Sequence, residues 1–313
     1  MIDCLSAGYR FLGWRLELIV IPIVLDLLLW LGPRLSVAPL FADLARLYSD
    51  MGTVDGVTPE LGQMVQQFST GIDTMGANSN LLGGLLSGSL LHVPSLPLVP
   101  TASPAAWTIT VSSAGAALLW WIGLSLIGLL IGVIYLTLLA RRLPIGSMAG
   151  APSTRTVAAV LRHWLQVIGL VISVALGLLL LYLPVSVVVG VLMLANPALG
   201  SAAAAMAGGL ALVVFFYLYF VTAALIMDNI PIMVAVVRSF RLVQENFWAT
   251  LGFIVLSNLI GLGFALLLLQ MANLGAWGIL AAIIINAYIG TGLSLALLVF
   301  YRSRVIKGEP QIA

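Results

Sequence analysis

Few residues of this chain could do chemistry, and the most conspicuous is Asp26, in the apolar segment PIVLDLLLW. A carboxylate inside a membrane is costly, so it usually faces neighbouring helices or a water-filled cavity. One interpretation of Asp26 is a site for a proton or a cation. The other is a structural carboxyl group that accepts hydrogen bonds from neighbouring helices.

Three further polar side chains lie in the last apolar hairpin, at Asn258, Gln270 and Asn286. Hydrogen bonds between helices account for such residues in membrane proteins. The alternative is a polar conduit that they would form together with Asp26. The sequence has no phosphate-binding loop, zinc-protease motif or nucleophile elbow, so we expect no catalytic residues, no metal site and no cofactor.

The stretch DNIPIMVAVVRSFRLVQENFW (228–248) concentrates charge in a chain with only 8% charged residues. At helical spacing, Arg238, Arg241 and Glu245 share one face. The opposite face is apolar: Ile232, Val236, Phe240, Val243 and Phe247. This pattern predicts a cytoplasmic amphipathic helix over residues 229–247. We expect its apolar face in the acyl boundary and its arginines toward lipid headgroups or a partner.

The residues that flank this helix fit its two ends. Asp228 or Asn229 is expected to cap the start, with Pro231 in the first turn. Trp248 follows the helix, and indole rings prefer the membrane interface. We therefore predict that Trp248 belongs to the same headgroup-binding or partner-binding surface as Arg238 and Arg241.

The same stretch resembles a recurring motif: DNIP at 228–231, VVRSFRLV at 236–243 and NFW at 246–248. It is similar to the pattern of a six-span prokaryotic membrane-protein family. That family includes the membrane domain attached to some glycerophosphodiester phosphodiesterases and YciC-like uncharacterised inner-membrane proteins. The resemblance implies an all-helical membrane fold and a bacterial-type membrane location. It does not imply phosphodiesterase activity, since no catalytic barrel follows the motif in this sequence.

Composition points to the same class of protein. Hydrophobic residues make up 62% of the chain, whereas soluble domains are about half apolar or less and about 25% charged. A formal net charge of +2 argues against general nucleic-acid binding. The single cysteine, Cys4, excludes an internal disulfide and any multi-cysteine metal site.

A membrane-spanning helix needs about 20 mostly apolar residues. Six segments meet this requirement and predict an all-α polytopic bundle: residues 12–31, 113–139, 164–190, 204–227, 248–270 and 277–300. We expect Pro184 to kink or end the third span. A short turn at 272–276 is expected to join the last two as an antiparallel hairpin.

Basic residues mark the cytoplasmic ends of membrane spans. With the N-terminus inside, 11 of the 13 basic residues are cytoplasmic, and only Arg34 and Arg46 lie outside. An alternative with a seventh span at 81–100 and the N-terminus outside gives the same count. The glycine, serine and proline content of residues 81–100 favours a packed or interfacial segment instead.

In the six-span arrangement, residues 32–112 form one long extracytoplasmic segment. Apolar residues recur at helical spacing from Val37 to Met51 and from Leu61 to Met75, which predicts two amphipathic helices. Thr58 and Pro59 suit the N-cap and first turn of the second helix. These helices would cover the bundle or lie on the outer leaflet.

The sequence therefore predicts a multi-pass protein of the bacterial plasma membrane with both termini cytoplasmic. We expect a non-enzymatic role as a membrane scaffold, accessory subunit or lipid-associated factor. Its expected partners are membrane lipids, with a larger membrane complex or a homo-oligomer as further alternatives, and no nucleic acid. The alternative function is a small-solute or ion transporter that uses Asp26. The scarcity of polar groups in the spans favours the first interpretation.

Overall fold

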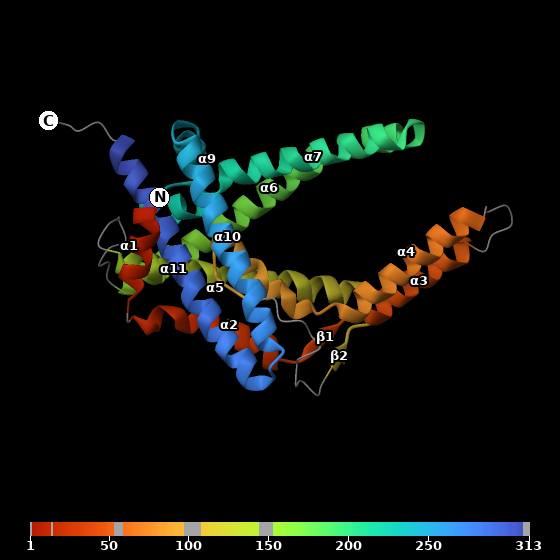
Figure 1. Cartoon of the computed structure of the whole chain (residues 1–313), viewed down its shortest axis with the longest axis horizontal. Helices are drawn as coiled ribbons and strands as arrows, with labels where there is room; N and C mark the ends of the chain where they lie inside the picture. Colours follow the sequence, from red (N-terminus) through yellow and green to blue (C-terminus); the bar gives the residue numbers. More distant parts are fainter. Residues whose placement is uncertain (1, 14, 53–58, 97–107, 144–152, 309–313) are drawn as a thin grey trace. The chain divides into compact units, whose positions relative to one another are not determined.

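The computed structural model describes residues 2–13, 15–52, 59–96, 108–143 and 153–308 (Figure 1). The described chain is 88% helical and has eleven α-helices. Five of its helical segments are long and apolar enough to cross a membrane, by length and composition. The chain is thus an all-α, multi-pass membrane protein, as the sequence predicts.

The long helices match five of the six predicted spans. They are α5 (Ala114–Arg142), α6 (Ser153–Ala195), α7 (Pro197–Leu218) with α8 (Val221–Asp228), α10 (Phe247–Ala272) and α11 (Ala276–Gly308). Each exceeds the 30 Å or so of a bilayer core at about 1.5 Å per residue. Gly275, at a φ of 93°, lies in the predicted tight turn between α10 and α11. Of the two expectations for Pro184, a kink or the end of the third span, the second is wrong, because α6 continues through this residue.

The first predicted span is divided in the structure. Residues 12–31 include the end of α1 (Ile2–Leu12), the 3-10 helix η1 (Leu16–Ile19) and α2 (Val20–Leu31). Gly13 has a φ of 42°, in the left-handed region that favours glycine, and it follows the end of α1. The 12 residues of α2 reach only about 18 Å. Six spans therefore remain a prediction, whereas five helices have the length to cross.

Two compact units make up the fold. The first contains Met1–Leu18, Val133–Gly261 and Thr291–Ala313, and the second contains Ile19–Gly132 and Leu262–Gly290. All 11 basic residues that the topology prediction assigns to the cytoplasm belong to the first unit. Arg34 and Arg46 belong to the second. The division of the fold therefore follows the predicted division of charge.

In the first unit, α6 and α7 form a long hairpin (green in Figure 1). The side-chain oxygen of Asn196 accepts hydrogen bonds from the backbone N–H groups of Ala198 (3.0 Å) and Leu199 (3.4 Å), and so caps α7. The most apolar 18-residue stretch of α6 has no buried residue. Such a surface suits contact with lipid tails rather than with water.

In the second unit, α3 (Ala38–Gly52) and α4 (Pro59–Asn78) form a hairpin (orange in Figure 1). Two helices are therefore present where the sequence predicts them, while their place at the membrane stays a prediction and Thr58 lies outside the described residues. The rings of Tyr48 and Phe68 meet edge to face at 5.1 Å. A short parallel pair, β1 (Arg34–Ser36) and β2 (Thr108–Thr110), was not predicted by the sequence.

The segment predicted to be either packed or a seventh span contains η2 (Leu81–Leu91), a 3-10 helix too short to cross a membrane. It packs closely on two glycines of α5. A Cβ added at Gly128 would lie 2.5 Å from the carbonyl oxygen of Leu85, and a Cβ added at Gly132 would lie 2.6 Å from the side chain of Leu91. Asn80 caps η2 by accepting a hydrogen bond from the Leu82 N–H (3.1 Å). The described part of this segment therefore favours the packed interpretation.

We predict that Gly128→Ala destabilises the protein by about 1–3 kcal/mol, since the new methyl group must displace the backbone of η2. Gly123→Ala is the matched control in the same helix, because nothing lies within 4 Å of the added Cβ. Thermal unfolding of the purified protein in detergent, followed by circular dichroism, measures both. Equal midpoints for the two variants would contradict the close packing of η2 on α5.

Candidate functional site

The predicted amphipathic helix is present as α9 (Ile232–Glu245). The expectation for its start is wrong, because Asp228 ends α8 and neither it nor Asn229 caps α9. Asn229 instead adopts a left-handed conformation, with a φ of 56°. Its side-chain oxygen accepts hydrogen bonds from Arg162 and, at 2.9 Å, from His163 Nε2. The DN pair thus turns the chain between α8 and α9.

One face of α9 packs on the protein rather than on lipid. Its buried residues are Ala235, Ser239, Leu242 and Val243. The Ser239 hydroxyl donates to the Tyr217 carbonyl oxygen (2.7 Å) and accepts from the Phe220 N–H (3.3 Å), where α7 gives way to α8. This corrects the expectation that the whole apolar face lies in the acyl boundary.

The aromatic members of that face remain partly exposed. Phe240 stacks on Tyr217 at 4.6 Å, and Phe247 meets Phe216 edge to face at 5.5 Å. Trp248, the first-turn residue of α10, is 78% exposed. Aromatic side chains are enriched at the membrane interface, and the role predicted for Trp248 in a headgroup-binding or partner-binding surface stays a prediction.

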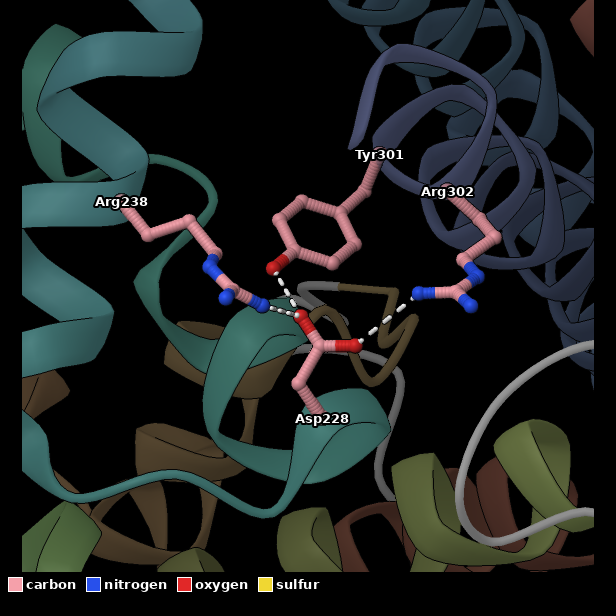
Figure 2. Close-up of polar contacts among 4 residues, drawn as sticks. All are labelled: Asp228, Arg238, Tyr301 and Arg302. Carbon is pink, nitrogen blue, oxygen red and sulfur yellow. Dashed lines mark hydrogen bonds and ion pairs between the residues drawn. The ribbon is translucent and has the colours of Figure 1, made fainter. Parts of the chain in front are cut away.

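Asp228 is the centre of a polar network in the first unit (Figure 2). Its Oδ2 accepts from Arg238 Nη1 of α9 (2.6 Å) and from the Tyr301 hydroxyl of α11 (2.5 Å). Its Oδ1 pairs with Arg302 Nη1 at 3.3 Å. The Asp228 side chain is only 9% exposed, so these donors compensate a charge that water scarcely reaches. The network ties α8 to α9 and α11.

The network also fixes the charge of Arg238. Burial acts to lower the pKa of its guanidinium, but the hydrogen bond to Asp228 and the proximity of Tyr301 outweigh burial. The pKa of Arg238 is therefore raised above its ordinary value. Arg238 was predicted to face only headgroups or a partner, whereas the structure also gives it an internal carboxylate.

Beside the network lies an open cavity of about 300 Å³ between α9 and α11. Its lining combines three arginines and one glutamate with apolar side chains: Val234, Val237, Arg238, Arg241, Leu242, Glu245, Asn246, Arg304 and Val305. We call this cavity the arginine pocket. Arg238 belongs both to the pocket and to the Asp228 network.

Two arginines of the arginine pocket have no counter-ion in the described part of the chain. Arg241 is exposed and makes no ion pair or side-chain hydrogen bond there. Arg304 lies over the Phe300 ring at 5.3 Å, and its buried Nε has no hydrogen-bond partner. Three arginines outnumber the one glutamate of the lining, and such a surplus of guanidinium groups favours an external anion.

Asp26 has a different environment, within the second unit. It is fully buried, and its carboxylate accepts from the Ser95 hydroxyl (2.5 Å) and from the Leu96 N–H (3.1 Å). Asn286 lies close to the same carboxyl group. These contacts match the structural interpretation of Asp26, because they fix the segment that follows η2 onto α2.

The other two polar residues do not join hydrogen bonds between helices. Asn258 is exposed, and its amide donates to the carbonyl oxygen of Ile254 in its own helix (2.8 Å). Gln270 is exposed at the end of α10. Asn286 is the member of this set that lies close to the Asp26 carboxyl group. The contacts of Asn258 and Gln270 give the alternative of a polar conduit no support.

The sequence prediction missed Asp228, Tyr301, Arg302 and Arg304 as site residues. The sequence contains a signal for each. Asp228 follows an apolar segment and lies ten residues before Arg238, and the motif YRSR at 301–304 follows the last apolar segment. Spacing alone did not show that the two segments meet. Among the described residues, no group of three or more His, Cys, Asp or Glu side chains could hold a metal ion.

Comparison with known proteins finds no matching protein-family model, no matching curated protein and no matching solved structure. The resemblance to the six-span prokaryotic family therefore rests on the motif alone. Membership of that family stays a prediction.

We predict that Tyr301→Phe lowers the free energy of unfolding by about 1–3 kcal/mol, since Asp228 loses a hydrogen-bond donor while the ring is retained. Tyr48→Phe is the control, because the described residues show only a ring contact for Tyr48. Chemical denaturation in mixed micelles measures both variants. No difference between them would mean that the hydroxyl of Tyr301 does not support the network.

Proposed function

We propose that this chain is a non-enzymatic, lipid-associated membrane protein that binds anionic headgroups in the arginine pocket. The observation that carries the proposal is the convergence of Arg238, Arg241 and Arg304 in one open cavity, two of them without a counter-ion in the described chain. Guanidinium groups match phosphate oxygens in geometry and charge. The pocket lies beside exposed apolar side chains of α9, among them Val234 and Val237. Such a surface suits a lipid headgroup at the membrane interface.

The location of the pocket supports a cytoplasmic-leaflet ligand. The first unit holds the 11 basic residues that the topology prediction assigns to the cytoplasm. Basic segments there are attracted to anionic lipids of the inner leaflet. Together with the motif resemblance, this favours a protein of the bacterial plasma membrane with both termini in the cytoplasm. A membrane complex or a homo-oligomer would be compatible with the same role.

The transporter alternative receives less support from Asp26. Its carboxylate is bonded to the chain segment that follows η2, within a single unit of the fold. A proton or cation site needs an accessible cavity, and the contacts of Asp26 account for it as a structural group. We therefore propose a structural role for Asp26.

We predict that the double variant Arg241→Gln/Arg304→Gln binds anionic lipids roughly tenfold or more weakly than the unaltered protein, because two charge-assisted contacts are lost. Native mass spectrometry of the full chain, titrated separately with phosphatidylglycerol and phosphatidate in neutral detergent, measures the affinity for each lipid. Arg46→Gln is the control, since Arg46 lies in α3 with a side chain that is 79% exposed. Unchanged affinity for both lipids in the double variant would refute headgroup binding at this pocket.

A further inference from the structure

The arginine pocket and the Asp228 network together carry a definite charge. Four arginines contribute positive charge, at Arg238, Arg241, Arg302 and Arg304, and two carboxylates oppose them, at Asp228 and Glu245. The formal net charge of the cluster is therefore +2. Arg238 and Arg302 share Asp228, which leaves +1 on the network, and Arg241 and Arg304 with Glu245 contribute the other +1.

We infer that the arginine pocket selects a lipid with a terminal phosphomonoester over one with a phosphodiester headgroup; this inference rests on the proposed binding of anionic lipids. A phosphomonoester carries about −1.5 to −2 charges at neutral pH and presents three terminal oxygens. It would balance the net +2 of the cluster. A phosphodiester has a single charge and two non-bridging oxygens, so it would leave part of the positive charge uncompensated.

The arrangement of donors suits three oxygens. Arg238 uses one nitrogen, Nη1, for Asp228, and it still lines the pocket. Arg241 comes from the following turn of α9, and Arg304 comes from α11, so the three guanidinium groups approach from two elements. Each can address a separate phosphate oxygen, and charge-assisted bonds of this kind are the strong ones. A diester would leave one guanidinium without a charged acceptor.

Asp228 acts here as a positioning residue. Its Oδ2 holds the Arg238 guanidinium at 2.6 Å, and the Tyr301 hydroxyl shares the same oxygen. The arginine is therefore oriented before a ligand arrives, which lowers the ordering cost of binding. Glu245 also lines the pocket, and its carboxylate limits the positive surplus of the arginines.

The apolar part of the lining indicates a lipid rather than free phosphate. Val234 and Val237 of α9 are about half exposed, at 46% and 50%, and Val305 lies beside Arg304. A soluble phosphate would gain nothing from these side chains. The glycerol and upper acyl carbons of a lipid would cover them and remove apolar surface from water.

The test compares two lipids that share acyl chains and differ in the phosphate. The full-length protein in neutral detergent is titrated with phosphatidate and, separately, with phosphatidylglycerol, and native mass spectrometry gives the affinity for the first bound lipid. We expect phosphatidate to bind roughly tenfold more tightly than phosphatidylglycerol, because a tenfold ratio of affinities corresponds to about one additional charge-assisted hydrogen bond. Arg304→Gln should reduce this preference to near unity, whereas Arg46→Gln should preserve it.

The outcomes separate the inference from the proposed function. Equal affinity for both lipids, with each lost in Arg241→Gln/Arg304→Gln, would overturn the phosphomonoester preference and leave headgroup binding intact. Loss of neither lipid in that variant would overturn both. Displacement of bound phosphatidate by inorganic phosphate at comparable concentration would overturn the assignment to a lipid. Asp228→Asn, if folded by circular dichroism, should also lower the preference, and an unchanged ratio would overturn the positioning role.

Discussion

The first unit depends on one nearly buried carboxylate, Asp228, at the point where an apolar helix ends. A charge with little access to water must be compensated by the protein, and removal of either partner would leave the other charge exposed to an apolar medium. Arg238 lies ten residues away in sequence and Tyr301 lies 73 residues away. The need to satisfy one side chain therefore brings α8, α9 and α11 together and places the basic residues of two helices around a common cavity.

A second constraint acts beside the first, on the backbone. The regular helical hydrogen bonding is interrupted at Tyr219 and Phe220, between α7 and α8. The Ser239 hydroxyl accepts from the Phe220 N–H and donates to the Tyr217 carbonyl oxygen. Arg238 and Ser239 are neighbours in α9. Arg238 pairs with Asp228 at the end of α8, and Ser239 bonds the backbone between α7 and α8. This gives a physical reason for the Arg-Ser pair in the motif VVRSFRLV. Either residue alone would hold α9 at one point and leave its rotation about that point less restricted.

Periodicity and composition predict the elements of this fold well and their contacts poorly. The five long apolar helices, the amphipathic α9 and the helices α3 and α4 follow from apolar spacing, which is local information. The division of residues 12–31 escapes such reasoning, because a single left-handed Gly13 ends a helix that composition would continue. The partners of Arg238 escape it too, since they depend on which of several helix ends meet. Sequence spacing places Arg238 and Arg241 on one face but does not bring Arg304 to them.

The two units treat their buried acids differently, and this difference bears on function. Asp26 in the second unit finds a hydroxyl, an N–H group and a nearby amide, all neutral, so these contacts satisfy its oxygens by hydrogen bonding without a counter-ion. Asp228 in the first unit is met by two arginines, and Arg241 and Arg304 lie nearby without an ion pair among the described residues, although Glu245 lines the same pocket. A cluster with a surplus of positive charge attracts anions, and a bound anion lowers the repulsion among its arginines. The proposed binding site therefore lies in the first unit, and the structural role that we propose for Asp26 concerns the packing of the second.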